Sequence, residues 1–417
     1  MKKMIMPLMI LSAIIGTETK AQIIHVSPRG DDRAEGTEAR PLKTLPAARD
    51  RMRTLRAKSN HADNARIIMH GGVYDLSEPL VLNEQDGGTA EHPLVWTGVP
   101  GEKVSITGGR TLRSEKFRKV TDAGILAQLD PAARGQVMQI DLKAEGVKDF
   151  GRHRQYGHSL PVIASTLELF FQGEPMTLAR YPNKGAIKIG KVADPGSVPR
   201  IGDKSNRGAT FAYTDPRHKR WAGVPNIWIQ GTLNYGFADD YNPIASIDTL
   251  KGTVKLGKPH LYGVGNGRDF QEYVAINILQ ELDSPGEWYM DDKKGILYLW
   301  PPSDVNKAVV QVSILETPII ALEGASHLRF ERSTIEVGRG IGVYMERCHR
   351  VVVAGCTIRN TGTAGVFMGQ GARLIDSTSS VDDYVGEPVS REVGSYQNHI
   401  YNNTTWQRNA GTYNGVE

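Results

Sequence analysis

Cysteine is scarce, because the 417 residues contain only Cys348 and Cys356. The second follows the first by eight positions, and a mostly extended segment of that length reaches up to about 26 Å. A disulfide requires Cα atoms within about 7 Å of each other, so we expect two free thiols. No histidine stands at a motif-like spacing from either cysteine, which argues against a catalytic thiol.

An excess of one charge sign is lacking as well. Fifty Lys and Arg against 46 Asp and Glu give a formal net charge of +4, and these residues are scattered along the chain. No basic run with interleaved aromatic residues is present, so the sequence does not support nucleic-acid binding. HExxH, Walker and paired CxxC motifs are missing too, and we therefore expect no metal and no cofactor.

Long apolar runs are confined to the N-terminus. Residues 5–15 form an apolar run that follows two lysines and is too short to span a bilayer. Small residues then lead to Ala21, which predicts a signal peptide over residues 1–21 with cleavage after Ala21. No cysteine lies near the cleavage point, so we expect no lipid anchor and a periplasmic or secreted monomer.

Glycine is abundant, at 45 residues, and residues 328–368 contain one unit twice with a period of 23. Each copy has three short alternating apolar segments separated by turn residues, and alternation is typical of strands. Three strands per period indicate a coil of a parallel β-solenoid, which must stack on a neighbour to bury its inner face. A β-sandwich is the alternative. The matched positions are Leu328 and Val351, Phe330 and Val353, Ile335 and Ile358, and Gly342–Met345 and Gly365–Met368.

The rest of the sequence predicts a helix that caps the solenoid and a domain inserted into it. Residues 44–56 have helical spacing, with one apolar stripe and a charged face, and we expect this helix to cap the open end of the solenoid. Residues 110–308 have longer, more aromatic strands without the 23-residue repeat, which predicts an inserted, β-sandwich-like domain. We assign 22–109 to the cap and first coils, and 309–417 to further coils. The apolar stripe is Leu45, Ala48, Met52 and Leu55; the charged face is Arg49, Asp50, Arg53 and Arg56.

Five stretches carry a resemblance. Residues 25–45 with Gly71–Tyr74 look like the N-terminal entry of right-handed parallel β-helix proteins. Leu178–Asn183, Trp228–Asp240 and Asn277–Pro302 are similar to glycoside hydrolase family 141 and its relatives. The resemblance implies an exported bacterial enzyme acting on plant cell-wall glycans, including pectin, with α-L-fucosidase or xylanase activity. It also implies further coils with catalytic carboxylates, whereas this chain ends in mid-coil, and we expect a truncated helix.

Glycoside hydrolysis uses two carboxyl groups about 5 to 5.5 Å apart for retention, or about 6.5 to 9.5 Å apart for inversion. Neighbouring coils lie about 4.8 Å apart, so carboxylates on consecutive coils of an exposed sheet are the expected pattern. The candidate catalytic residues are Asp382 and Asp383, in a loop that interrupts the third coil. Tyr384, Glu387 and His399 are the substrate-binding candidates in or beside this loop.

Asp239 and Asp240 are further substrate-binding candidates because they lie near four aromatic residues, a combination that also suits the packed rim of a β domain. Three functions stay open. The first is a glycoside hydrolase acting on polysaccharide or oligosaccharide, and the second is a polysaccharide lyase on the same scaffold. The third is a non-catalytic glycan-binding protein or an inactive truncated β-helix. The aromatic neighbours are Trp228, Tyr235, Phe237 and Tyr241.

Overall fold

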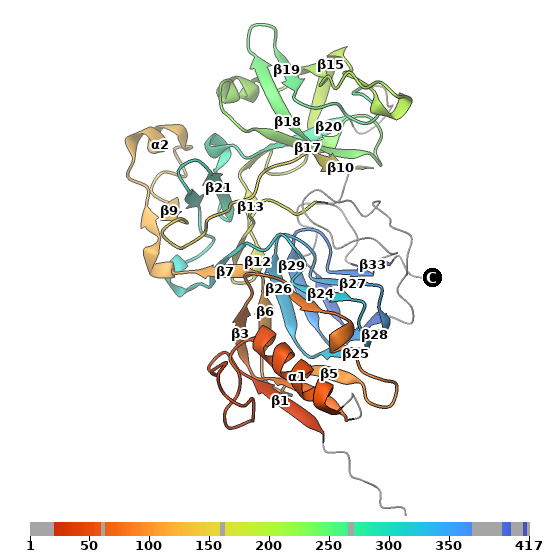
Figure 1. The fold of residues 1–417 in the computed structure, drawn as a ribbon. Helices are drawn as coiled ribbons and strands as arrows, with labels where there is room; N and C mark the ends of the chain where they lie inside the picture. The colour runs from red at the N-terminus through yellow and green to blue at the C-terminus, as the bar shows by residue number, and fades with distance from the viewer. Residues whose placement is uncertain are drawn as a thin grey trace, which may run out of the picture.

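The structure, a computed structural model, describes residues 21–59, 63–158, 163–265, 271–368, 394–401 and 412–414. The described chain is almost entirely β-structure, as predicted, with the α-helices α1 (Leu45–Ser59) and α2 (Ala123–Gln128). Figure 1 shows the strands near the two ends of the chain, β1 to β6 and β24 to β33, in the lower half, and the barrel strands from the middle of the chain in the upper half. No helix within the described ranges is long and apolar enough to cross a membrane.

Three parallel sheets make up the lower half. Sheet A contains β1 (Gln22–Val26), β2 (Ala65–Met69), β5 (Leu94–Gly98), β25 (Ser326–Glu331), β28 (His349–Ala354) and β31 (Gly394–Tyr396). Sheet B contains β3 (Gly72–Asp75), β6 (Val104–Thr107), β26 (Thr334–Gly338), β29 (Thr357–Thr361) and β32 (His399–Tyr401). Sheet C contains β4 (Leu80–Leu82), β24 (Ile320–Glu323), β27 (Val343–Glu346), β30 (Val366–Met368) and β33 (Thr412–Asn414).

The 23-residue repeat sets the register of all three sheets. Leu328 pairs with Val351 in sheet A, Ile335 with Ile358 in sheet B, and Val343 with Val366 in sheet C. Successive strands therefore pass from sheet A to B to C, and the next strand returns beside the first. The predicted register is confirmed by these pairings, and the matched apolar positions lie in one shared core except for Tyr344 and Phe367, which pack on the outer face of sheet C.

The helix α1 closes one end of this core. Its apolar stripe is buried in the cluster shared by the three sheets, and the helix packs on β1 and β2. Arg56, predicted on the charged face, is instead only 1% exposed. It follows Ala48 and Met52 at intervals of four residues and so continues their buried stripe.

The residues between β6 and β24 leave the stacking of sheet A uninterrupted. β25 pairs directly with β5, and Phe330 stacks on Trp96 with ring centroids 6.0 Å apart. Two small sheets lie next to the three parallel sheets. One contains β7 (Gly109–Leu112), β11 (Leu169–Phe171), β12 (Glu174–Pro175) and β23 (Val310–Ser313). The other contains β8 (Arg118–Lys119), β9 (Met138–Asp141), β13 (Thr177–Leu178), β21 (Glu287–Asp291) and β22 (Ile296–Leu299).

The third inserted sheet closes into a barrel, where the sequence predicted a sandwich-like domain. β18 closes the barrel because its ten residues are enough to pair with two different strands. Its first half pairs with β17, and its second half, from Ile244 to Asp248, pairs with β19. The barrel strands are β15 (Ile187–Asp194), β16 (Thr210–Tyr213), β17 (Trp228–Thr232), β18 (Asp239–Asp248), β19 (Thr253–Leu256) and β20 (Glu272–Ile276); β10 (Tyr156–Gly157) and β14 (Arg180–Tyr181) extend it.

Candidate functional site

Two glutamates occupy equivalent positions on neighbouring strands of sheet C. Alternation points Val343 and Met345 into the core, which leaves Glu346 on the outer face of β27. In β24 the same alternation leaves Glu323 outside, and Glu323 pairs in register with Glu346. The strands are about 4.8 Å apart. Carboxylates thus stand on consecutive coils, as expected for a glycoside hydrolase, although Glu346 is buried.

The two carboxylates have different surroundings. Glu346 is buried and accepts hydrogen bonds from the Tyr344 hydroxyl at 3.0 Å and from the backbone N–H of Arg347 at 3.2 Å. Burial, followed by the charge of Glu346, raises the pKa of Tyr344 far above its usual range. Glu323 forms an ion pair with the guanidinium of Arg347, and its side chain is 24% exposed. The charge of Arg347 acts on both carboxyl groups: Glu323 forms an ion pair with it, and Glu346 also accepts from the Tyr344 hydroxyl.

An aromatic row continues beside this pair. Tyr344 pairs in register with Phe367, and their rings stack with centroids 5.4 Å apart at 22°. With Ile341 and Ala364 they form a small apolar cluster outside the core that the three parallel sheets share. The outer face of sheet C therefore combines two carboxylates with an aromatic stack, and of these side chains Glu323 is the part-exposed one.

Sheet B carries a polar groove of about 340 Å³, bounded on its other side by β7, β23 and the turn after β11. Glu336 lies buried at its floor and accepts hydrogen bonds from the Ser105 hydroxyl at 2.5 Å and from Arg359 Nε at 2.7 Å. Lys103 also lines the groove and forms no ion pair within the described ranges. The groove thus holds one carboxylate and two cations, with Gln172 and Gln311 as further polar groups.

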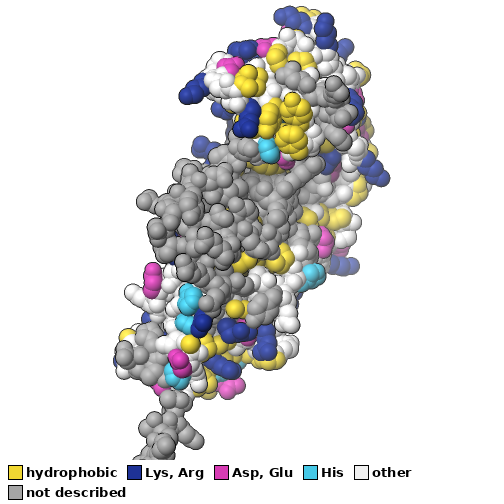
Figure 2. All heavy atoms as spheres, turned by 90° about the vertical axis from the view of Figure 1, so that its right-hand side faces the viewer, with side chains coloured by type: hydrophobic (Ala, Val, Ile, Leu, Met, Phe, Trp, Pro, Cys, Tyr) yellow, Lys and Arg dark blue, Asp and Glu magenta, His cyan; other side chains and the backbone are white. Residues whose placement is uncertain are grey.

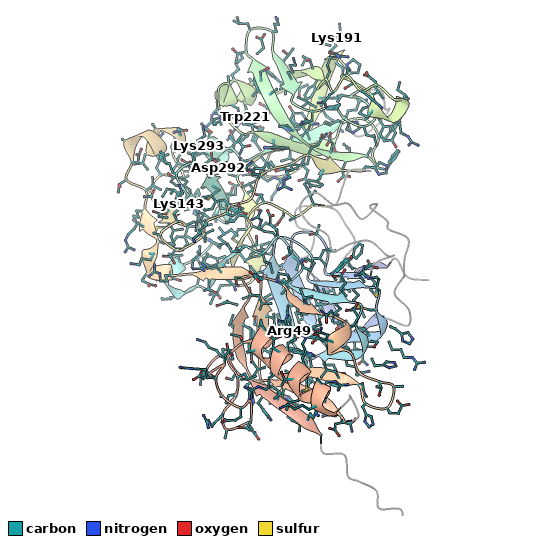
Figure 3. The ribbon with its side chains drawn as sticks, viewed as in Figure 1. Arg49, Lys143, Lys191, Trp221, Asp292 and Lys293 are labelled. Atoms are coloured by element: carbon teal, nitrogen blue, oxygen red, sulfur yellow. The ribbon has the colours of Figure 1, made fainter. Side chains whose placement is uncertain are left out.

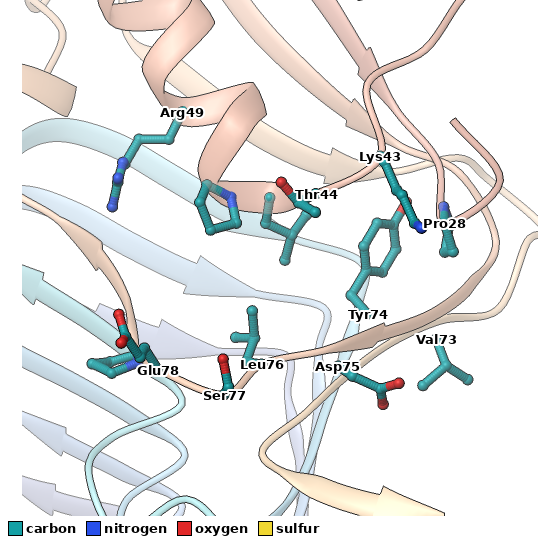
Figure 4. A pocket seen from close by; sticks show the side chains of 13 residues that line it. Pro28, Lys43, Thr44, Arg49, Val73, Tyr74, Asp75, Leu76, Ser77 and Glu78 are labelled. Atoms are coloured by element: carbon teal, nitrogen blue, oxygen red, sulfur yellow. The ribbon is translucent and has the colours of Figure 1, made fainter. Parts of the chain in front are cut away.

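A pocket of about 490 Å³ lies between the start of α1 and the segment from β3 to β4. It also contains two carboxylates, Asp75 and Glu78. Figure 4 shows them at opposite ends of the row, with Leu76 and Ser77 between them. Arg49 donates to the Val81 carbonyl at 3.1 Å and so fastens α1 to β4. Because its carboxylates do not converge, this pocket is a weaker catalytic candidate than the pair on sheet C.

Another pocket, of about 440 Å³, lies on the inserted sheets and is lined by His153, Trp288, Asp292 and Lys293. Figure 3 shows Asp292, Lys293 and Lys143 together on the module of β9 and β21, below the barrel that carries Trp221. Lys143 donates to the Lys293 carbonyl at 3.0 Å, which fixes the turn between β21 and β22. Asp292 and Lys293 therefore belong to the turn between β21 and β22 rather than to a catalytic pair.

The predicted site residues do not gather in one place. Asp382, Asp383, Tyr384 and Glu387 lie outside the described residues. His399 is exposed on β32 in sheet B, where it pairs with Thr357. Asp239 and Asp240 lie on β18 and line one small pocket of about 90 Å³ together with His158 and His260. Figure 1 places β18 at the far end of the molecule from β27.

Sequence reasoning missed Glu323 and Glu346, although a signal was present. They are 23 residues apart, so they extend the repeat to five residues before Leu328, where the matched unit was taken to begin. Glu336 and Arg359 are also one period apart and pair in register. Reading the repeat for polar as well as apolar positions would have found both pairs.

The prediction of two free, structural cysteines is confirmed. Cys348 and Cys356 are unbonded and buried. The Cys356 sulfur lies 3.7 Å from the hydroxyl of Ser333, its counterpart in the preceding coil. Burial raises the pKa of the Cys348 thiol to about 12 and also raises that of Cys356. Both thiols therefore stay protonated at neutral pH and are poor nucleophiles.

Comparison with known proteins supports the fold. A family model described as a right handed beta helix region matches residues 313–405. A solved structure titled "Glycoside hydrolase" is 18% identical with a TM-score of 0.61, and the match covers 86% of this chain and 69% of that one. No curated protein matches the chain.

Two more distant structures have TM-scores too low to carry an argument. "The complex structure of XylC with xylose" is 11% identical with a TM-score of 0.41, covering 94% of this chain and 56% of that one. The Gp54 tailspike of Acinetobacter baumannii bacteriophage AP22, in complex with capsular saccharide, is 8% identical with a TM-score of 0.16, covering 84% and 43%. The comparisons therefore show that the chain contains a β-helix region and shares its fold with a glycoside hydrolase.

Proposed function

We propose that the protein is a glycoside hydrolase whose catalytic carboxyl groups are Glu323 and Glu346. The observation that carries this proposal is their pairing in register on neighbouring strands of sheet C. A separation close to the spacing of two strands, about 4.8 Å, is nearer to the distance used for retention than to that used for inversion.

The surroundings of the two groups suggest their roles. Glu323 faces Arg347 and is part-exposed, so it would act as the nucleophile or base. Glu346 accepts from the Tyr344 hydroxyl and would protonate the leaving oxygen. The buried Tyr344–Phe367 stack would hold the Tyr344 hydroxyl in place against Glu346. Pairs of carboxyl groups in contrasting environments commonly divide the work in this way.

We further propose that the substrates are plant cell-wall side chains, of the α-L-fucosidase or xylanase type, and that the protein is exported. The supports are the sequence blocks similar to glycoside hydrolase family 141 and the apolar N-terminal segment. Asp382 and Asp383 stay alternative catalytic candidates. Their loop follows β30, the next strand of sheet C after β27.

The test incubates the purified protein with xylan and pectic oligosaccharides and identifies the products by mass spectrometry. Glu323→Gln and Glu346→Gln should each lower the rate about 10²- to 10⁴-fold, because each removes one partner of the acid–base pair. Glu336→Gln is the matched control, a buried glutamate paired with an arginine on a different sheet, and should change the rate less than about threefold.

Two outcomes would contradict the assignment. A large loss in Asp382→Asn or Asp383→Asn, with Glu323→Gln and Glu346→Gln unchanged, would move the site to the loop after β30. A folded wild-type protein that releases no sugar from any of these substrates would overturn the hydrolase proposal.

A lyase is the second candidate, and the sheet B groove favours it. A lyase needs a cation to neutralise a uronate carboxylate and a base to remove the neighbouring proton. Lys103 and Arg359 line the groove together with Glu336. Unsaturated products from pectic oligosaccharides, abolished by Glu336→Gln and retained in Glu346→Gln, would establish this alternative.

A further inference from the structure

The barrel exposes a pair of stacked aromatic rings. Tyr235 is 41% exposed and Phe237 is 62% exposed, and they are the exposed large aromatic side chains of the described part of the chain. Their ring centroids are 5.5 Å apart, and the ring planes differ by 4°. The Tyr262 ring meets both edge-on, at 5.3 and 5.8 Å. Figure 2 shows hydrophobic side chains gathered on this end of the molecule.

The rings stand on a fixed support. Ala238 N–H donates to the Tyr235 carbonyl at 3.0 Å, which closes the turn that carries both rings. The buried Asn234 side chain donates to the carbonyls of Tyr262 and Gly263 at 2.9 and 3.1 Å, and so ties this turn to the neighbouring loop. A rigid set of rings loses little conformational entropy when a ligand binds.

A polar wall adjoins the rings. His158 meets Phe237 edge-on at 5.2 Å and also lines the small pocket with Asp239, Asp240 and His260. The Asp240 carboxylate accepts from Gln155 at 3.1 Å and from Asn242 at 2.9 Å. No lysine or arginine is among the described residues that line this pocket. Among the described residues, the wall therefore offers oxygen acceptors and imidazole groups and neither lysine nor arginine.

We propose that Tyr235, Phe237 and Tyr262 form a second glycan-binding site, the barrel platform, which is separate from the carboxylate pair on sheet C. A pyranose ring has an apolar face of C–H groups that can lie on an aromatic ring, and hydroxyl groups at its edge that donate to carboxylates. The bound glycan is a neutral polysaccharide, because the Asp239 carboxylate would repel a uronate and no lysine or arginine among the described residues of the small pocket offsets that repulsion.

The inference rests on the proposed function only for the class of its ligand. The platform would hold a long polysaccharide on the barrel, at the far end of the molecule from sheet C (Figure 1). A site of this kind raises the local concentration of substrate for insoluble chains and adds nothing for short oligosaccharides.

The experiment measures binding to insoluble xylan and to polygalacturonate by depletion from solution, with every protein carrying Glu346→Gln to prevent turnover. The double variant Tyr235→Ala and Phe237→Ala should weaken xylan binding by about tenfold or more, from the loss of two stacking rings. Leu250→Ala is the matched control, because Leu250 is 98% exposed on the same barrel, and it should bind as before. Phe237→Trp should retain binding and shows that the turn still folds.

Several results would overturn the platform. Xylan binding equal in the double variant and the control would do so, as would binding to polygalacturonate alone. Self-association lost in the double variant, without any glycan binding, would make the rings a contact between two copies of the chain. Failure of the platform leaves hydrolysis of short oligosaccharides intact, whereas failure of the hydrolase proposal leaves binding intact, so the two are distinguishable.

Discussion

At the scale of single residues, environment decides what a carboxyl group can do. Asp240 is buried among neutral donors, and burial raises its pKa to about 7. Glu145, in contrast, is buried beside Arg113, whose hydrogen bonds hold the pKa of that carboxyl below its usual value. Both are buried acids, yet only Asp240 can exchange a proton near neutral pH.

The raised pKa of Asp240 makes stability depend on pH. Between its usual pKa near 4 and its folded value of about 7, the folded state holds a proton that the unfolded state has released. Stability from this group therefore falls as pH rises through that window, by up to about 4 kcal/mol for a shift of about three units. Asp240→Asn removes the titration, so its stability relative to wild type should improve from pH 5 to pH 8.

Urea unfolding of both proteins at the two pH values measures this difference. Other titrating groups, including Glu287 with its pKa raised to about 7 by burial, are common to both proteins and cancel. Equal differences in the free energy of unfolding at pH 5 and pH 8 would show that Asp240 does not titrate in this range.

At the scale of elements, α1 is held by a narrow stripe. Met52 is buried in the core that the three parallel sheets share, on the side of α1 that packs on β1 and β2. Arg53 forms an ion pair with the buried carboxylate of Asp86 at 2.5 Å. The apolar stripe covers the end of the core, and the ion pair fixes the helix over the segment after β4. Without this cover, sheet A would present an open core at β1.

Met52→Ala should therefore lower the free energy of unfolding by about 2 to 5 kcal/mol, the range for a buried large-to-small change. Thr54→Ala, at an exposed position two residues further along the same helix, should change it by less than about 0.5 kcal/mol. Thermal unfolding followed by circular dichroism compares them. Similar melting temperatures for the two variants would mean that α1 does not stabilise the sheets.

At the scale of the whole molecule, the parallel sheets and the barrel have separate hydrophobic cores. The three parallel sheets share one cluster of buried side chains, and the barrel has its own, centred on residues such as Phe211 and Ile229. The two small inserted sheets lie between them with further clusters. Chains with several cores often unfold in more than one step.

Calorimetry should then resolve more than one transition. Ile335→Ala, in the core of the parallel sheets, should lower the temperature of one transition, and Ile229→Ala, in the barrel, should lower that of another; both side chains are fully buried. A single transition that both variants shift equally would show that the parts unfold as one cooperative unit.

The sequence by itself determined the all-β class, the register of the repeated strands and the buried stripe of α1. These follow from local rules, because side chains alternate along a strand and recur every three to four residues along a helix. The same repeat placed Cys356 over Ser333. Each of these predictions needed residues no more than one coil apart.

Only the tertiary structure decided the rest. The barrel closes because β18 divides its ten residues between two partner strands. The sequence of a short antiparallel strand is similar in a barrel and in a sandwich, so it does not distinguish the two folds. The hydrogen bond from Ser105 to Glu336 joins residues 231 positions apart, and the barrel platform assembles rings from two different loops. The insertion between β6 and β24 separates residues in the sequence that the stacking of β25 on β5 brings together. Contacts between residues so far apart in the sequence are set by packing of the whole chain rather than by any local pattern.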